Sequence, residues 1–271
     1  MKFIRALLIP IILVGLGRPA ATTAQDLSAI FKDTTATFVL YDLKRDRYIR
    51  YNEKRASERF SPFSTFKVPN SIIGLESGVI KDENFVIAWD RKKYPPDPDW
   101  NREPFLHWKR DHSLQTAIKY SVVWYYKELA LKVGEPAMKQ YVAKLNYGNQ
   151  DTTGGLDKFW LNSSLRISAE EQVSFLKAFY TGKLDISSRT TGIVKRIILL
   201  EQTPRYRLSG KTGGGPLPHG SLGWFVGYLE RDDNVYFFAT NIEGPNYFAI
   251  RDKRIELTRR VLAELGLLDK V

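Results

Sequence analysis

The two ends of the chain carry the polar and apolar pattern of β-strands. Residues 35–42 (TATFVLYD) are rich in β-forming residues that partly alternate, and residues 47–51 predict a returning strand after a polar turn. A second hairpin is predicted by residues 223–229 (GWFVGYL) and 235–240 (VYFFAT), which flank a polar turn. Apolar residues spaced by three and four then predict a final helix over 252–265.

Between these hairpins, roughly over residues 61–200, the pattern is mostly helical. Apolar residues recur with a helical period over 113–131 and 136–145, and residues 193–200 are expected to continue the helical layer. Ser168 and Glu171 form a capping box, which predicts a helix that runs from there through Tyr180.

This order of elements predicts an α+β fold. One antiparallel sheet is formed by both chain ends, and a mainly helical lobe over about 61–200 is inserted between them, as in an α/β/α sandwich. No repeat or flexible linker divides the chain. The two lobes are expected to share a cleft, where binding sites often form.

Residues 1–24 are typical of a secretory signal peptide. Lys2 and Arg5 precede an apolar run over residues 6–17, and the segment ends in the small residue Ala24. The run is shorter than the roughly 20 residues that cross a bilayer, although an uncleaved anchor or a buried helix remains an alternative. We therefore expect one mature domain over 25–271, exported to the periplasm or the cell exterior and not integral to a membrane.

Charge and cysteine content exclude several classes of protein. The formal net charge is +11, of which the leader contributes three basic residues, leaving +8. The basic residues are scattered and no nucleic-acid motif occurs, so we expect a solvated surface and no nucleic-acid partner. The chain has no cysteine, which excludes disulfides, thiol catalysis and Cys-based zinc sites. No metal-ligand spacing such as H-E-x-x-H occurs, and we expect no metal.

Ser64 and Lys67 offer a nucleophile and a base. The three histidines lie near no serine motif such as G-x-S-x-G, which argues against a histidine triad. If a helix begins at Ser64, positions i and i+3 share a face, and the free N–H groups at its start favour a developing oxyanion. The pattern S-x-x-K alone is weak, because Ser174 and Lys177 repeat it inside an amphipathic segment.

Further motifs follow the first S-x-x-K in order. They are S-x-V at Ser121–Val123, Y-G-N at Tyr147–Asn149 and K-T-G at Lys211–Gly213. They are accompanied by Pro69-Asn70, by Trp108 with Arg110-Asp111, by Phe159-Trp160-Leu161 and by Gly223–Gly227. With these residues the chain resembles the class D serine β-lactamases (oxacillinases), which are related to penicillin-binding proteins. The resemblance covers nearly the whole mature chain and implies a serine β-lactamase/transpeptidase-like fold.

The resemblance also implies the chemistry of the first motifs. Ser64 would be acylated by a β-lactam, and Lys67, carboxylated on its amine by carbon dioxide, would be the general base for acylation and deacylation. Burial among apolar neighbours, which we expect to include Val123, Trp160 and Leu161, would lower the pKa of Lys67 and leave an amine able to add carbon dioxide. The indole N–H of Trp160 would hold the carbamate, and Ser121 would pass a proton toward the leaving nitrogen.

The K-T-G motif is implied to bind the substrate. Lys211 and Thr212 would receive its carboxylate, Gly213 would allow close approach, and the backbone N–H groups of Ser64 and Gly214 would form the oxyanion hole. Arg251 resembles the arginine that grips the carboxylate; a solvated helix start, with other arginines nearby, is the alternative.

Two other functions remain open from the sequence. One is a penicillin-binding enzyme that passes its acyl group to an amine, and the other is a β-lactam sensor domain that stays acylated. In all three cases the partner is a β-lactam, no cofactor beyond carbon dioxide is expected, and the protein is a monomer or a homodimer.

Overall fold

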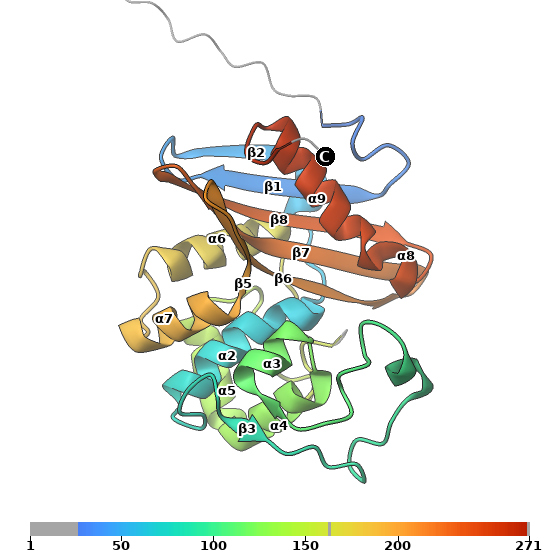
Figure 1. Ribbon diagram of the computed structural model, residues 1–271, viewed down its shortest axis with the longest axis vertical. Helices are drawn as coiled ribbons and strands as arrows, with labels where there is room; N and C mark the ends of the chain where they lie inside the picture. The colour runs from blue at the N-terminus through green and yellow to red at the C-terminus, as the bar shows by residue number, and fades with distance from the viewer. Residues whose placement is uncertain (1–26, 162–163, 270–271) are drawn as a thin grey trace, which may run out of the picture.

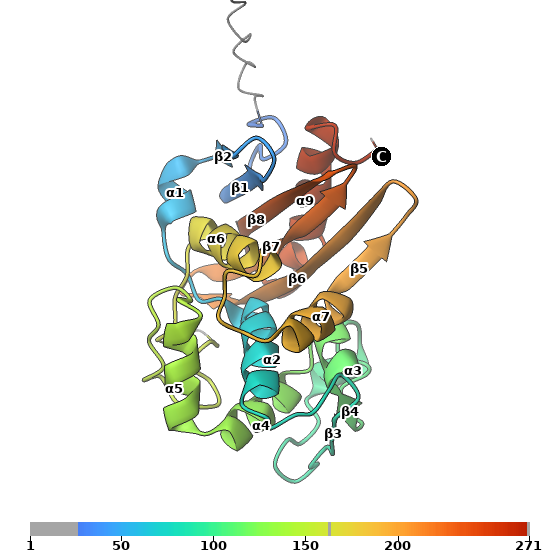
Figure 2. The same cartoon turned by 90° about the vertical axis from the view of Figure 1, so that its left-hand side faces the viewer.

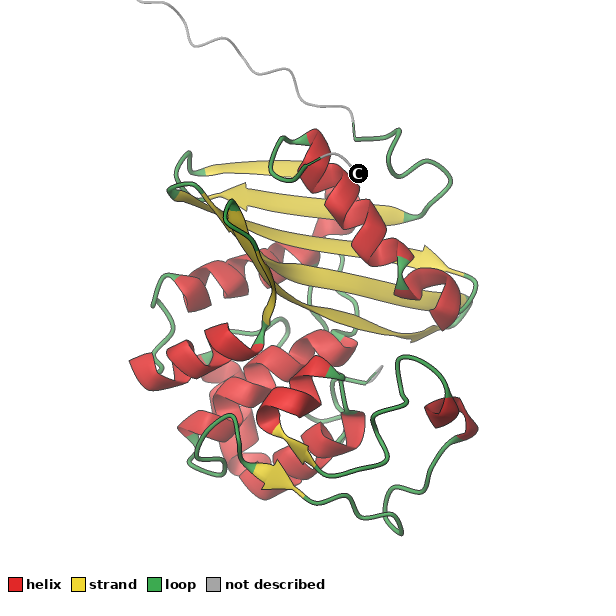
Figure 3. Ribbon diagram, viewed as in Figure 1, coloured by secondary structure: helices red, strands yellow, loops and turns green. Residues whose placement is uncertain are grey.

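The computed structural model describes residues 27–161 and 164–269, so the predicted leader over 1–24 lies outside the described residues. Its main sheet has six antiparallel strands in the order β2-β1-β8-β7-β6-β5 (Figure 3). In chain order the strands are β1 (Ala36–Asp42), β2 (Arg47–Tyr51), β5 (Leu199–Gln202), β6 (Tyr206–Leu217), β7 (Gly220–Arg231) and β8 (Asn234–Gly244). Both predicted hairpins are present, with β7 and β8 longer than expected.

The first strand of the sheet pairs with the last one. β1 lies between β2 and β8, and Val39 of β1 is opposite Ala239 of β8. The prediction that both chain ends build one antiparallel sheet is therefore confirmed.

Helices cover both faces of the sheet, as Figures 1 and 2 show. α8 (Tyr247–Arg251) and α9 (Lys253–Glu264) lie on one face. The other face meets the inserted lobe, whose helices are α1 (Glu53–Ser57), η1 (Phe63–Phe66), α2 (Lys67–Glu76), η2 (Pro98–Asn101), α3 (Leu114–Lys119), α4 (Val123–Val133), α5 (Glu135–Lys144), α6 (Ala169–Tyr180) and α7 (Ser188–Ile197). A small ribbon of β3 (Val86–Ile87) and β4 (His112–Ser113) completes the lobe. In the described part of the chain, no helix is long and apolar enough to cross a membrane.

Alternating side chains of the strands build a separate core on each face. Val39 and Val226 belong to the core shared with the helical lobe, whereas Phe38 and Phe225 belong to the core under α9. This alternation is the ordinary geometry of a strand that is buried on both faces. The predicted α/β/α sandwich is confirmed.

The helical pattern over 113–131 was predicted as one segment, and the structure breaks it. α3 ends at Lys119 and α4 begins at Val123, with Ser121 at a φ of 54°. The Ser121 N–H donates to the Ile118 carbonyl and the Val122 N–H to the Ala117 carbonyl, which is the hydrogen-bond pattern of a Schellman C-cap. The helical period of apolar residues continues across this cap, so the break between α3 and α4 cannot be predicted from the pattern.

Two smaller predictions have different outcomes. The helix over 193–200 is wrong at its end, because α7 stops at Ile197 and Leu199 begins the edge strand β5. The capping box before α6 is confirmed: the Ser168 hydroxyl accepts from the Glu171 N–H, and the Glu171 carboxylate accepts from the Ser168 N–H.

Candidate active site

Ser64 and Lys67 lie one turn apart at the start of α2. Ser64 belongs to the 3₁₀ turn η1, which runs directly into the helix at Lys67, and the Lys67 Nζ is 2.6 Å from the Ser64 Oγ. The predicted α-helical start at Ser64 is thus a tighter turn, but it brings the two side chains together as expected.

Lys67 is fully buried in an apolar pocket. Its Nζ lies 5.4 Å from the ring centre of Tyr126, and the neighbouring Phe66 stacks on Trp160. Among the described residues no carboxylate lies within ion-pair distance of Lys67. Burial and, secondarily, the charge of Lys211 therefore lower the pKa of Lys67 well below 10.5. This shift favours the neutral amine, whose nitrogen has a free electron pair.

The indole of Trp160, which stacks on Phe66 next to Lys67 in the chain, is buried and has no acceptor among the described residues. Its Nε1 has no hydrogen-bond partner among the described residues, and the ring is fully buried. A buried N–H without a partner costs about 1–3 kcal/mol. The site therefore suits an additional acceptor, and an anionic one most of all.

Ser121 and Lys211 form a second hydroxyl–amine pair. Their Oγ and Nζ atoms are 3.0 Å apart, and Lys211 also donates to the carbonyl of Thr212. Burial, and after it the charge of Arg254, lowers the pKa of Lys211 to about 7. The left-handed backbone at Ser121, which costs a non-glycine residue about 1–2 kcal/mol, belongs to the cap that separates α3 from α4.

The strand that carries K-T-G approaches η1 very closely. A Cβ at Gly213 would lie 2.8 Å from the Pro62 carbonyl oxygen, and one at Gly215 would lie 2.2 Å from the Phe63 ring. Glycine at these positions lets β6 lie beside the turn that holds Ser64.

A cleft of about 790 Å³ opens between β6, η1, the α3–α4 junction and α8. Seven predicted site residues line it besides Ser64: Ser121, Val123, Lys211, Thr212, Gly213, Gly214 and Arg251. Lys67 and Trp160 are fully buried, and Leu161 packs half-buried against the same core. In the described chain, His, Asp and Glu side chains form no group of three that could hold a metal.

The two arginines at the far end of the cleft have different surroundings. Arg251 makes a two-pronged ion pair with Asp252, and both of its hydrogen bonds measure 2.9 Å. Arg254 is buried, donates to the carbonyl of Gly213 and keeps an Nε without a partner in the described chain. The role of Arg251 stays a prediction. Arg254 is a second candidate, which its sequence neighbourhood did not single out.

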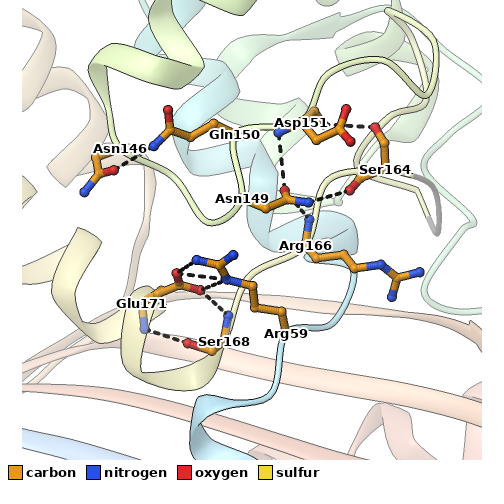
Figure 4. A network of polar contacts seen from close by, with 9 residues as sticks. All are labelled: Arg59, Asn146, Asn149, Gln150, Asp151, Ser164, Arg166, Ser168 and Glu171. Carbon is orange, nitrogen blue, oxygen red and sulfur yellow. Dashed lines mark hydrogen bonds and ion pairs between the residues drawn. The ribbon is translucent and has the colours of Figure 1, made fainter.

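The Y-G-N motif fastens the segment that carries Trp160. The Asn149 side chain accepts from the Arg166 N–H and donates to the Ser164 carbonyl, each at 2.9 Å (Figure 4). Tyr147 is buried edge-on against Phe66 and donates to Gln172. These contacts are structural, and the motif does not line the cleft.

The paired hydroxyls and amines on this fold define a serine acyl-enzyme of the penicillin-binding class. The family described as penicillin binding protein transpeptidase domain matches residues 26–263. Within that class, the chain belongs to the class D β-lactamase family.

The chain is 42% identical to the probable β-lactamase YbxI of Bacillus subtilis (strain 168), over 88% of this chain and 84% of that protein. It is 41% identical to β-lactamase OXA-48 of Klebsiella pneumoniae, over 83% and 82%. The solved structure of BPu1 β-lactamase is similar with a TM-score of 0.81 and 38% identity, covering 92% of this chain and 99% of that one. A sensor relative also matches: regulatory protein BlaR1 of Bacillus licheniformis is 36% identical over 91% of this chain, but only 39% of that protein is covered.

Proposed function

We propose that this protein hydrolyses β-lactams through an acyl-enzyme on Ser64, with Lys67 carboxylated on Nζ as the general base. The observation that carries the proposal is the buried Lys67 amine, 2.6 Å from the Ser64 hydroxyl, together with a buried Trp160 N–H that has no acceptor among the described residues. Burial lowers the pKa of Lys67 and so favours its neutral form. The electron pair of Nζ adds to the carbon of carbon dioxide, and the nitrogen loses a proton. The product is an anion whose oxygens can accept from the indole.

The steps at Ser64 follow from this base. The carbamate takes the Ser64 proton as Oγ bonds to the lactam carbonyl carbon, and the carbon–nitrogen bond breaks. Ser121, 3.0 Å from the Lys211 ammonium, delivers its proton to the leaving nitrogen and receives in its place the proton that the carbamate took from Ser64, so that the carbamate is an anion again. The carbamate then takes a proton from the water that attacks the ester carbon, and it returns this proton to the Ser64 Oγ as the ester bond breaks. The Ser64 and Gly214 N–H groups stabilise the oxyanion in both steps.

The test is the dependence of turnover on bicarbonate. Steady-state hydrolysis should fall as the pH is lowered, because the carbamate protonates and is lost, and added bicarbonate should restore it. Lys67→Ala should be acylated more slowly and then stay acylated, as measured by intact mass, and bicarbonate should not rescue it. Lys177→Ala is the matched control, because Lys177 holds the same position in the second S-x-x-K and packs on Tyr41 away from the cleft. Wild-type turnover by Lys67→Ala would show that another base acts.

A β-lactam sensor is the second candidate, favoured by the likeness to BlaR1. Intact mass followed after brief exposure to penicillin separates the two functions. A hydrolase returns to its free mass within minutes, whereas a sensor remains one penicillin heavier.

We further propose that the protein is exported and cleaved before Gln25, which the basic and apolar pattern of residues 1–24 supports. N-terminal sequencing of the protein from the culture medium or periplasm should begin at Gln25. A chain that begins at Met1 would contradict this proposal.

A further inference from the structure

A groove lies next to the catalytic cleft, at the edge of β6. Its volume is about 580 Å³, and residues of α3, β5 and α9 line it. Figure 1 shows these three elements on the near side of the molecule. The groove and the cleft share four residues, Lys119, Lys211, Thr212 and Ile255. The cleft and the groove therefore have a common wall.

The groove exists because β5 covers only the first part of β6. β5 pairs from Gln202 opposite Arg207 to Leu199 opposite Ser209, and the Gly210 N–H donates to the Ile198 carbonyl. Beyond that point β6 pairs with β7 alone. The edge from Lys211 onward therefore remains open to a ligand.

The walls of the groove are mainly apolar. Apolar residues from each element line it: Ile118 of α3, Leu200 of β5, Leu208 and Phe225 of the sheet, and Ile255 of α9. Leu200 is 55% exposed, so a ligand that covers its side chain would remove apolar surface from water.

The charged residues at the rim are mostly paired with each other. Arg259 is 2.7 Å from Glu201, and Arg196 is 2.6 Å from Glu83. Lys119 makes no ion pair among the described residues. Because Glu201 and Glu83 are already paired, an apolar group can enter the groove without desolvating an unpaired carboxylate. Because Lys119 makes no ion pair, the groove favours apolar or weakly anionic groups.

The proposed function fixes which part of a substrate meets this groove. A β-lactam is held at its carbonyl by Ser64 and at its carboxylate by Lys211 and Thr212, and those two residues are the wall that the groove shares. In a cephalosporin the C3 substituent is attached beside the carbon that bears the carboxylate, whereas the C7 side chain is at the opposite end. We propose that the groove is a subsite for an apolar C3 substituent, an inference that rests on the proposed function.

The test compares two cephalosporins with the same C7 side chain, one with a methyl group at C3 and one with an arylvinyl group. The quantity measured is the second-order rate constant for acylation of Ser64, followed by intact mass. Leu200→Asp should lower acylation by the arylvinyl compound about tenfold, which corresponds to about 50 Å² of lost apolar contact. Acylation by the methyl compound should change less than about twofold. Val86→Asp is the matched control, because Val86 is 56% exposed on the ribbon of the helical lobe.

Gln115→Trp narrows the same groove from α3 and should also lower acylation by the arylvinyl compound selectively. Equal effects on both compounds, or no effect of either substitution, would overturn the proposal. Failure of the proposed function is a separate result: acyl-enzyme on the wild-type protein would persist with both compounds, while the ratio of the two acylation rates would still report on the groove.

Discussion

At the scale of single residues, the site depends on two lysines buried within one cleft. Lys67 is fully buried and Lys211 is 6% exposed. Burial removes water from both amines and lowers the pKa of each. At Lys67 the charge of Lys211 adds to the effect of burial. These surroundings support the proposal that Lys67 supplies the base and Lys211 the cation for the substrate carboxylate.

A buried amine of this kind should cost the fold stability. Lys67→Met keeps a long apolar chain without the amine, and we expect a gain of about 1–2 kcal/mol in the free energy of unfolding at pH 7. Between the lowered pKa in the fold and 10.5, the unfolded chain binds the extra proton, so wild-type stability rises with pH. The advantage of Lys67→Met should therefore shrink toward pH 10. Thermal unfolding at several pH values measures this, and a lower melting temperature for Lys67→Met at pH 7 would contradict it.

The protonation of Lys211 should appear in the kinetics. With a pKa of about 7 in the free protein, Lys211 loses its charge as the pH rises above neutrality, so kcat/KM should fall there. Arg254→Gln removes one cause of the lowered pKa and should move this fall to higher pH, besides raising KM. Arg251→Gln is the control, because Arg251 is paired with Asp252 and does not contribute to the shift. An unchanged pH profile for Arg254→Gln would refute this account.

At the scale of elements, the sequence predicted those parts that have local signals. The terminal strands follow from alternation and β-forming residues, and α6 follows from its capping box at Ser168. The break at Ser121 has no such signal, because a serine occupies the left-handed position where glycine is usual. The burial of Arg254 could not be predicted from the sequence either, because it depends on how α9 packs beside Gly213 and not on the neighbours of Arg254 in the chain.

Gly148 of the Y-G-N motif should tolerate replacement by alanine much less well than Gly182, although both have a positive φ. Gly148 has a φ of 57°, and a Cβ there would lie 2.1 Å from the Arg166 carbonyl oxygen. Gly148→Ala should therefore cost about 3 kcal/mol or more and lower turnover by displacing the Trp160 segment. Gly182 has a φ of 70° with no atom within 4 Å, so Gly182→Ala should cost only about 1 kcal/mol. Urea unfolding of both variants makes the comparison, and similar losses would show that the contact with Arg166 is unimportant.

At the scale of the whole molecule, the two hydrophobic cores share the strands of one sheet and are expected to unfold together. One core includes the helical lobe and the other lies under α9, and both use strands β1, β7 and β8. Figure 2 shows the sheet between the two layers of helices. The catalytic cleft and its groove lie where β6, η1, α3 and α9 meet, so their geometry depends on both cores.

This arrangement predicts one cooperative unfolding transition. Leu262→Ala removes a fully buried side chain from the core under α9 and should cost about 2–5 kcal/mol. Tryptophan fluorescence, which reports mainly on the lobe core, and circular dichroism should shift to the same lower urea midpoint. Separate midpoints for the two probes would show that the layers unfold independently.

The pairing of β1 with β8 also has a consequence for biosynthesis. Val39 emerges from the ribosome early, but its neighbour Ala239 is made 200 residues later. The sheet therefore cannot close around a partly made polypeptide, and contacts between such distant segments form slowly. This delay is compatible with the export proposed above, because a chain must be unfolded to pass through a translocation pore, and it leaves apolar strand edges exposed to aggregation in the meantime.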